Sequence, residues 1–194
     1  MRVISERISI DETKNFSLVI LGKVEKWKES LLFFWVLAWS FCGSVFLFYY
    51  FSENPLQYSL PLLIMLAFWL YFEVRILKVF LWRRNGFEHI QFSEKEVLIK
   101  NNLFGRGKRK AYGFENIEIF IENEYSPKNF FSFLDQSFWV IGGQRIYFSY
   151  LGKSVVLGMQ LEEDEVKKLL SILNGQLKRM KRELRAKSRK LEDQ

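Results

Sequence analysis

The sequence has few residues of the types that carry cross-links, catalysis or sharp turns: one cysteine, one histidine and three prolines among 194 residues. Cys42 has no second cysteine to pair with, which excludes an intramolecular disulfide framework. His89 is the only imidazole, so a multi-histidine metal site is excluded, and we expect no histidine-based catalytic triad. We interpret His89 as a surface or edge-strand side chain. The sequence therefore predicts neither an enzyme nor a bound cofactor.

Two further signals are missing. Residues 104–110, Phe-Gly-Arg-Gly-Lys-Arg-Lys, form a glycine-rich basic turn that lacks the Gly-Lys-Ser/Thr ending of a nucleotide-binding loop, so ATP or GTP binding is not supported. The first thirty residues are mostly polar, unlike a cleavable signal peptide, and we expect the first apolar stretch to act as an uncleaved anchor.

The acidic cluster at residues 162–165 predicts the start of a helix, with a divalent-cation site as the alternative.

Two long stretches without charge dominate the chain, Leu31–Phe51 and Leu56–Phe72. A helix over the first reaches about 31 Å, which is enough to cross the hydrocarbon core of a bilayer. The second reaches about 25 Å, and a continuation to Trp82 would complete a crossing. We expect Glu73 to lie at the cytoplasmic interface. Residues 30–82 are therefore predicted to form a transmembrane hairpin, with a soluble protein that buries two apolar helices as the alternative.

The charges that flank the two stretches predict their orientation. Residues 1–30 carry six Lys or Arg, three of them just before the first stretch, and Lys78, Arg83 and Arg84 follow the second. The connection Ser52–Pro55 carries none. Because cytoplasmic loops carry the excess of Lys and Arg, both termini are predicted to lie in the cytoplasm. We expect a multi-pass protein of the cytoplasmic, or inner, membrane.

After Gly86 the hydrophobic period changes from helical to alternating. The alternating segments predict five to seven short strands, an irregular stretch at Tyr125–Gln136 predicts a short helical turn, and the apolar stripe within Val166–Leu173 predicts an amphipathic helix. The fold class is α+β: a two-helix transmembrane hairpin followed by a small antiparallel barrel or sandwich capped by a C-terminal helix. The expected parts are a cytoplasmic segment at 1–29, the hairpin at 30–82, the strand domain with its helix at 86–176 and a basic tail at 177–194.

Three sequence features carry a resemblance to a known group of proteins. They are Gly105-x-Gly107 ahead of a basic strand, the aromatic run Tyr147–Lys153, and Gly158-Met159 ahead of the acidic helix start. Together with the two spans, this layout resembles bacterial proteins with two transmembrane helices and a pleckstrin-homology-like domain. It is also similar in architecture to the photosystem I assembly factor of plastids and cyanobacteria. The resemblance implies a docking or assembly role rather than catalysis.

Two basic segments are candidate contact sites for lipid headgroups or other anions. The first is the glycine-rich basic turn, and the second is the tail, where eight Lys or Arg fall within residues 178–190. A domain tethered to a bilayer has anionic lipid within reach. Nucleic acid could neutralise the same charges but finds no base-reading pattern, and a merely solvated basic segment remains open. The candidate residues are Arg106, Lys108, Arg109, Lys110, Lys178, Arg179, Lys181, Arg182 and Arg185.

These features predict a non-enzymatic, membrane-anchored docking protein whose pleckstrin-homology-like domain binds a protein partner or the anionic inner leaflet. The alternative is a small accessory subunit or assembly factor of a larger membrane complex, with the hairpin as its packing surface. Small residues in the first stretch support that alternative because they let helices approach closely; they are Ala38, Ser40, Gly43 and Ser44. The expected partners are the lipid bilayer, anionic phospholipid headgroups and a protein. No metal, cofactor or nucleic acid is expected.

Overall fold

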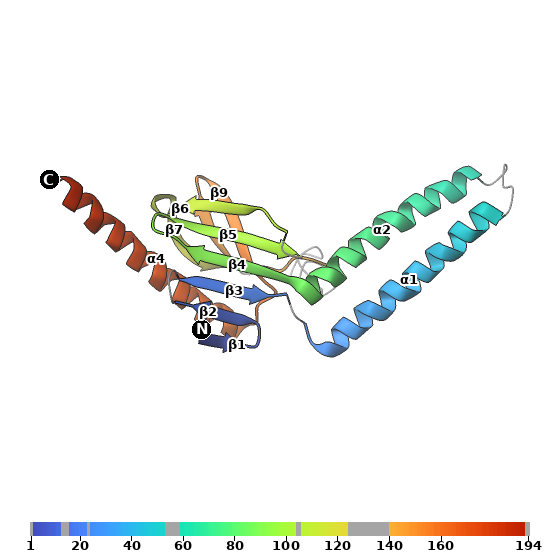
Figure 1. Cartoon of the computed structure of the whole chain (residues 1–194), viewed down its shortest axis with the longest axis horizontal. Helices are drawn as coiled ribbons and strands as arrows, with labels where there is room; N and C mark the ends of the chain where they lie inside the picture. The colour runs from blue at the N-terminus through green and yellow to red at the C-terminus, as the bar shows by residue number, and fades with distance from the viewer. Residues whose placement is uncertain are drawn as a thin grey trace.

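The computed structural model describes residues 2–12, 16–22, 24–52, 59–103, 106–123 and 140–192. Three parts follow one another along the longest axis (Figure 1): a helical hairpin, two antiparallel sheets, and the outer half of a C-terminal helix. The far end of the hairpin and the C-terminus lie at opposite ends of the molecule. Three features of the sequence analysis lie outside the described residues. They are the connection beyond Ser52, Gly105 of the glycine-rich basic turn, and the irregular stretch Tyr125–Gln136.

The hairpin consists of α1 (Lys26–Ser52) and α2 (Ser59–Asn85). Both helices are long and apolar enough to cross a membrane, and only 11% and 6% of the residues in their most apolar windows are buried. A core helix of a soluble protein would instead be mostly buried. The predicted hairpin is thus present, and its two exposed apolar helices could be membrane spans.

Small and aromatic side chains pack α1 against α2. Gly43 is buried, and a Cβ atom there would lie 1.8 Å from the Trp69 ring, so the contact needs glycine. Trp69 Nε1 donates a hydrogen bond to the Trp39 carbonyl at 2.9 Å. Ser40 Oγ donates to Glu73 Oε1 at 2.7 Å, near the middle of both helices. Glu73 therefore lies well inside α2 rather than at its end, because the helix continues without a break to Asn85.

The larger sheet has six antiparallel strands in the order β1-β2-β3-β4-β5-β6. They are β1 (Arg2–Ser5), β2 (Ile8–Asp11), β3 (Ser17–Leu21), β4 (Gly86–Phe92), β5 (Glu96–Leu103) and β6 (Arg109–Gly113). Along β2, β3 and β4 buried and half-buried side chains alternate, as in strands that place one face on a core. The two strands predicted directly after the hairpin correspond to β4 and β5.

Residues 1–29, which the sequence analysis set apart from the strand domain, contribute three strands to its larger sheet. β3 pairs with β4, with Leu18 opposite Ile90. The Gly22 N–H donates to the Gly86 carbonyl at 2.8 Å, so the chain enters and leaves the hairpin at one place. The apolar side chains of β2 and β3 lie in one core with those of the strands that follow the hairpin. The strands before the hairpin are therefore part of the strand domain.

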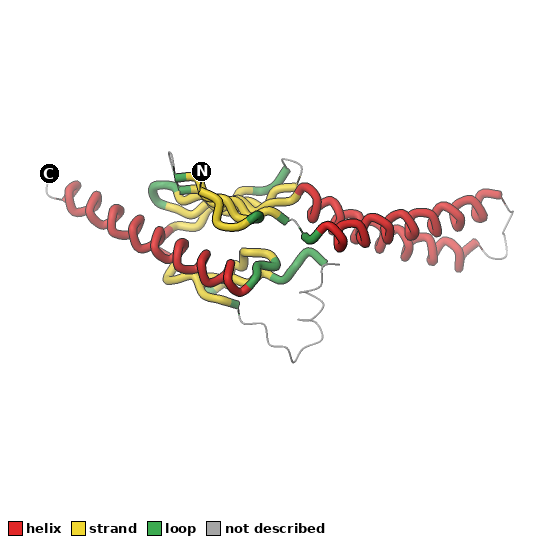
Figure 2. Tube along the Cα trace, turned by 90° about the horizontal axis from the view of Figure 1, so that it is seen from below, coloured by secondary structure: helices red, strands yellow, loops and turns green. Residues whose placement is uncertain are grey.

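The smaller sheet has three antiparallel strands, β7 (Ile117–Glu122), β8 (Gln144–Tyr150) and β9 (Lys153–Met159), and follows a 3₁₀ turn, η1 (Phe114–Asn116). The last helix, α4 (Glu163–Glu192), lies over the open side between the two sheets (Figure 2). One core joins both sheets and α4; its fully buried side chains include Ile8, Leu18, Phe92, Phe120, Phe148 and Leu169. The predicted combination of antiparallel sheets and a C-terminal helix is confirmed.

α4 continues without a break through residues predicted to form a separate basic tail. Leu177 is buried in the core, and Met180 packs against it. The last part of the helix extends past the sheets toward the C-terminus (Figure 1). The boundary expected at residue 177 therefore falls inside a helix, and the basic residues after it have helical spacing.

Candidate anion-binding surfaces

A buried polar junction ties the two sheets together beside the hairpin. Glu88 on β4 is buried, and its Oε2 accepts hydrogen bonds from the N–H groups of Gly158 at 2.8 Å and Met159 at 3.3 Å. Gly158 has a φ of 74°, a conformation that favours glycine. Burial raises the pKa of the Glu88 carboxyl. Because backbone donors enclose this carboxyl, it is suited to hold β4 against β9 rather than to contact a substrate.

Arg7, in the turn between β1 and β2, extends the junction to the start of α4. Its guanidinium donates to the carbonyl oxygens of Leu21, Met159 and Gln160 at distances between 2.9 and 3.3 Å. These three carbonyls lie at the end of β3, at the end of β9 and just after β9. One side chain thus connects the strands before the hairpin with the smaller sheet.

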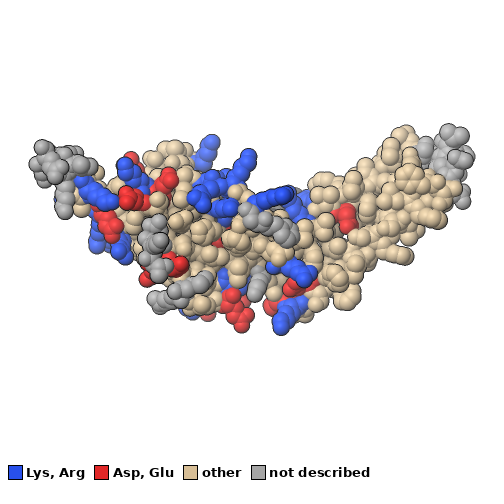
Figure 3. All heavy atoms as spheres, in the orientation of Figure 1, with Lys and Arg blue, Asp and Glu red and all other residues tan. Residues whose placement is uncertain are grey.

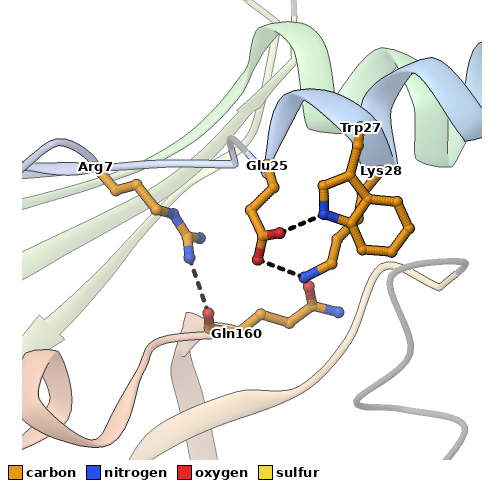
Figure 4. A network of polar contacts seen from close by, with 5 residues as sticks. All are labelled: Arg7, Glu25, Trp27, Lys28 and Gln160. Carbon is orange, nitrogen blue, oxygen red and sulfur yellow. Dashed lines mark hydrogen bonds and ion pairs between the residues drawn. The ribbon is translucent and has the colours of Figure 1, made fainter.

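The first turn of α1 carries a polar cluster beside Arg7 (Figure 4). Glu25 accepts hydrogen bonds from the indole of Trp27 and, at 2.7 Å, from the ammonium of Lys28. Trp27 is 60% exposed, and Lys28 Nζ lies 5.5 Å from its ring centroid. Exposed tryptophan and lysine at the end of an apolar helix are typical of a membrane–water interface. The junction therefore marks the base of the hairpin.

The glycine-rich basic turn lies at this same base. Leu103, the last residue of β5, pairs with Gly86, the first residue after α2. The N–H groups of Leu103 and Arg106 each donate to the other residue's carbonyl at 2.9 Å. Lys110 pairs with Ile99, which faces the core, so Lys110 lies on the other side of β6 from Arg109. All four candidates of the turn are exposed: Arg106, Lys108, Arg109 and Lys110.

A cross-strand row on the outer face of the larger sheet extends the turn. His89 on β4 lies opposite Lys100 on β5, and Lys100 lies opposite Arg109 on β6. The candidate residues chosen from the sequence omit His89 and Lys100. The spacing in the sequence carried a signal, because a tight hairpin whose turn spans residues 93–96 places residue 89 opposite residue 100. We call His89, Lys100, Arg106, Lys108 and Arg109 the proximal basic surface.

The charges of the row act on one another. Partial burial, followed by the neighbouring Arg109 and Lys100, lowers the pKa of His89. Two further bases thus lie beside His89 on the outer face of the larger sheet. Lysine and arginine donate hydrogen bonds to phosphate and carboxylate groups, and this is the chemistry that the proximal basic surface offers.

Figure 3 shows where charge gathers on the face of the molecule seen in Figure 1. Lys and Arg side chains collect over β5 and β6, next to the base of the hairpin. The hairpin in the same view is almost entirely uncharged. The proximal basic surface thus borders directly on the apolar part of the molecule.

The second predicted basic segment, Lys178–Arg185, lies in the outer half of α4, and we call it the distal basic helix. Arg179 forms an ion pair with Glu183 at 3.0 Å. Lys181 Nζ donates a hydrogen bond to the carbonyl of Ile117 on β7. The remaining candidates are exposed: Lys178, Arg182 and Arg185. Two of the five candidate side chains are therefore already engaged within the chain.

The distal basic helix lies far from the base of the hairpin. α4 begins near the junction, where Ser5 Oγ donates to Glu165 at 2.7 Å, and runs toward the opposite end of the molecule (Figure 1). At a helical rise of 1.5 Å per residue, Lys178 lies about 20 Å and Arg185 about 30 Å beyond Glu165. There, Lys181 and Arg185 help to line a groove of about 430 Å³ between α4 and η1. The structure keeps the two predicted basic segments apart.

Among the residues that the structure describes, no group of three or more His, Cys, Asp or Glu side chains is placed to hold a metal ion. The acidic cluster opens a helix as predicted, with Glu163, Asp164 and Glu165 in the first turn of α4. Glu165 Oε2 accepts a hydrogen bond from the Glu162 N–H at 3.1 Å, which satisfies a donor at the helix start. These carboxylates therefore have a structural explanation.

No family model, no curated protein and no solved structure matches the chain. Its function is therefore inferred from its own hairpin, junction and basic surfaces.

Proposed function

We propose that the chain is a non-enzymatic docking protein anchored in the cytoplasmic membrane. α1 and α2 cross the bilayer, and the two sheets with α4 form a cytoplasmic domain that binds a protein partner or the anionic inner leaflet. The observation that carries this proposal is the exposure of the hairpin, since few residues of its apolar windows are buried. Apolar surface of this extent needs lipid or protein to cover it.

Strand pairing supports the orientation that we propose. β3 precedes α1 and β4 follows α2, yet the two strands pair with each other. The two ends of the hairpin therefore lie on one side of any membrane that the helices cross. Lys28 and Arg84 stand at those ends, and the excess of Lys and Arg on cytoplasmic segments favours the cytoplasmic side.

The arrangement of the domain supports a pleckstrin-homology-like fold. After the hairpin come six antiparallel strands, β4 to β9, in two facing layers, and then a helix over their open side (Figure 2). This order favours a small barrel closed by a terminal helix, which is the form that the resemblance implies. β1 to β3 are an addition from residues before the hairpin. Docking is the role that this resemblance suggests for the domain.

The anchor and the orientation can be tested with the full chain carrying a C-terminal tag. Washing membranes with alkaline carbonate should leave the protein in the pellet. Protease should remove the tag from inverted vesicles and leave it intact on spheroplasts. Release by carbonate would show that the hairpin is not an anchor, and cleavage only from outside would reverse the proposed orientation.

A pair of matched variants sharpens this test. Leu37 on α1 is 50% exposed and Ile119 on β7 is 49% exposed. Leu37→Arg places a charge on the proposed lipid-facing surface and should reduce membrane retention, because a central charge costs about 2.5–3.5 kcal/mol on insertion scales. Ile119→Arg places the same charge on the cytoplasmic domain and should leave retention unchanged. Equal retention of the two variants would contradict the proposal.

The alternative, an accessory subunit or assembly factor, would use the hairpin as a packing surface. Two of its small residues already serve contacts within the chain, since Gly43 meets Trp69 and Ser40 bonds Glu73. A partner would have to pack on the outer faces of α1 and α2. Purification in mild detergent from the native host, with mass spectrometry of bound proteins, separates the two readings. A stoichiometric partner that survives salt washing favours the subunit, and its absence favours a docking protein with transient contacts.

A further inference from the structure

We propose that the groove between α4 and η1 binds an acidic segment of a partner protein, with Lys181, Arg185 and Arg189 as the contacts for its carboxylates. The inference rests on the proposed docking function and adds to it a site and the chemistry of the partner. We call this groove the distal groove, and its lining includes Phe114, Glu115, Lys181, Leu184, Arg185 and Arg189.

The distal groove combines apolar and basic side chains. Phe114 on η1 is buried and Leu184 on α4 is half-buried, so carbon atoms form part of the lining. Lys181, Arg185 and Arg189 follow one another at intervals of four residues, which puts them on one face of the helix about 6 Å apart along its axis. A volume of about 430 Å³ falls within the range of sites that hold small ligands, roughly 300–1,000 Å³. The groove is therefore large enough for one apolar side chain and its neighbours in a peptide.

The charge of the distal groove is predominantly positive. Its three bases are accompanied by one acid, Glu115. Lys181 Nζ donates to the carbonyl of Ile117, but a neutral acceptor leaves the charge of the ammonium in place. Arg185 and Arg189 are exposed, and neither forms an ion pair within the part of the chain that the structure describes. Each guanidinium group is therefore able to donate a pair of hydrogen bonds to a carboxylate.

A second groove beside α4 shows that this excess of positive charge is particular to one side of the helix. It lies between α4 and the larger sheet and has a volume of about 330 Å³. Its bases are paired with its own acids, Arg179 with Glu183 at 3.0 Å and Lys187 with Glu94 at 3.4 Å. Glu12 adds a further acid to the lining. The second groove thus neutralises its own bases, whereas the distal groove keeps its positive charge for a partner.

The position of the distal groove favours protein over lipid as the source of the negative groups. α4 begins near the base of the hairpin, where Glu165 accepts a hydrogen bond from Ser5. Arg185 and Arg189 lie about 30 Å and about 36 Å farther along the helix axis. The C-terminus and the far end of the hairpin lie at opposite ends of the molecule (Figure 1). Since the Debye length at physiological ionic strength is about 8 Å, headgroups around the base of the hairpin exert little attraction on the groove.

The apolar and basic side chains of the groove contribute differently to binding. Exposed ion pairs are individually weak, so the affinity depends mainly on burial of an apolar side chain of the partner. The bases select acidic partners and speed their association, an effect that weakens as salt is added. The expected ligand is therefore an aromatic or large aliphatic side chain with acidic residues on both sides.

The test uses the full-length protein in nanodiscs of phosphatidylcholine and a fluorescein-labelled peptide, Glu-Asp-Glu-Phe-Asp-Glu-Asp. Fluorescence anisotropy should show saturable binding that weakens as salt is added. A peptide with Gln and Asn in place of the acids, and one with Ser in place of Phe, should each bind at least about tenfold more weakly, since the first loses charge and the second loses apolar burial. Absence of saturable binding by the acidic peptide, or equal binding of the uncharged peptide, would overturn the proposal.

Matched variants separate the groove from the general charge of the helix. Arg185→Glu with Arg189→Glu reverses two charges in the distal groove, and Lys178→Glu with Arg182→Glu reverses two exposed charges of α4 that do not line it. The first pair should weaken binding of the acidic peptide at least about tenfold, and the second pair should change it by about threefold or less. Equal losses in the two pairs would show unspecific attraction to the helix and would refute the site.

Two further arms identify the ligand class. A single-stranded oligonucleotide that displaces the peptide, and that itself loses binding in the Arg185→Glu, Arg189→Glu pair, would assign the groove to nucleic acid instead. Phosphatidylglycerol in the discs should leave the affinity for the peptide unchanged, and loss of the peptide from such discs would assign the groove to lipid.

The anchor and the site fail separately in this experiment. A protein that enters the nanodiscs but does not bind the peptide keeps its proposed anchoring and loses the distal groove as a docking site. A protein that binds the peptide but does not enter the discs keeps the site and refutes the anchoring.

Discussion

The hairpin and α4 are built from helices of similar length, 27, 27 and 30 residues, yet they differ in where their apolar side chains lie. α1 and α2 expose apolar residues over most of their surface, whereas α4 buries one stripe in the core and exposes charged residues elsewhere. Length therefore does not distinguish the two kinds of helix. The distribution of side chains around the axis does, because it reports which medium covers the helix.

This comparison predicts that leucine contributes differently in the two regions. Leu169 on α4 is fully buried, and Leu169→Ala should destabilise the domain by about 2–5 kcal/mol, since it removes buried methyl groups and leaves a cavity. Leu37 on α1 is 50% exposed, and Leu37→Ala should change the stability in detergent by about 0.5 kcal/mol or less. Thermal unfolding followed by circular dichroism checks both. Similar losses would mean that α1 is covered by protein.

The two regions should also differ in how much a carboxylate contributes to stability, since Glu88 is buried and Glu73 is half-buried. Glu88→Ala leaves the N–H groups of Gly158 and Met159 without their acceptor, at about 1–3 kcal/mol for each buried donor. Glu73→Ala removes one hydrogen bond from Ser40, and such bonds between membrane helices average about 0.6 kcal/mol. Chemical unfolding of the two variants in one detergent measures the difference. A larger loss for Glu73→Ala would reverse the comparison.

The pH dependence of stability offers a second view of Glu88. Burial raises its pKa, so its contribution to stability is fully present below the ordinary Glu value near 4.3 and is lost as the pH rises through the raised value. Glu88→Gln keeps an acceptor oxygen and does not titrate. Its unfolding free energy should therefore lack this fall with rising pH. Identical pH profiles for the variant and the unmodified protein would show that Glu88 does not titrate in this way.

Glycine gives the smallest predicted contrast, with opposite signs in the two regions. Gly43→Ala should weaken the hairpin by about 1–3 kcal/mol, because its Cβ would overlap the Trp69 ring. Gly175→Ala on α4 meets open space and should stabilise the helix by about 0.5–1 kcal/mol. Melting temperatures of the two variants should move in opposite directions. A stabilised Gly43→Ala protein would mean that α1 and α2 do not pack as described.

The sequence predicts the parts of the fold that depend on local pattern. α1 and α2 follow from uncharged stretches, and β4 and β5 follow from alternation, because each signal lies within a few neighbouring residues. The place of β1 to β3 does not follow, because Leu18 pairs with Ile90 across the whole hairpin. Pairing of that kind depends on which apolar faces remain uncovered after folding, and a local pattern does not contain this information.

The candidate surfaces, like the fold, could be predicted from the sequence only in part. The basic turn was identified from composition, and the alignment of His89 with Lys100 could have been obtained from the turn between β4 and β5. The separation of the proximal basic surface from the distal basic helix could not be predicted from the sequence. It depends on the direction in which α4 leaves the junction at Arg7 and Glu88. The hydrogen bonds of Glu88 to Gly158 and Met159 are likewise a product of tertiary packing.

The pairing of β3 with β4 also determines the order of events while the chain is being synthesised. A ribosome that adds about 5–20 residues per second needs roughly 3 to 13 seconds to synthesise residues 22–85, which separate the two strands. During that interval β1, β2 and β3 exist without their partner, and β3 presents an unpaired edge that other chains could join. In each newly made molecule the hairpin must therefore be inserted before the larger sheet can be completed. Slow insertion should lead to aggregation through the N-terminal strands.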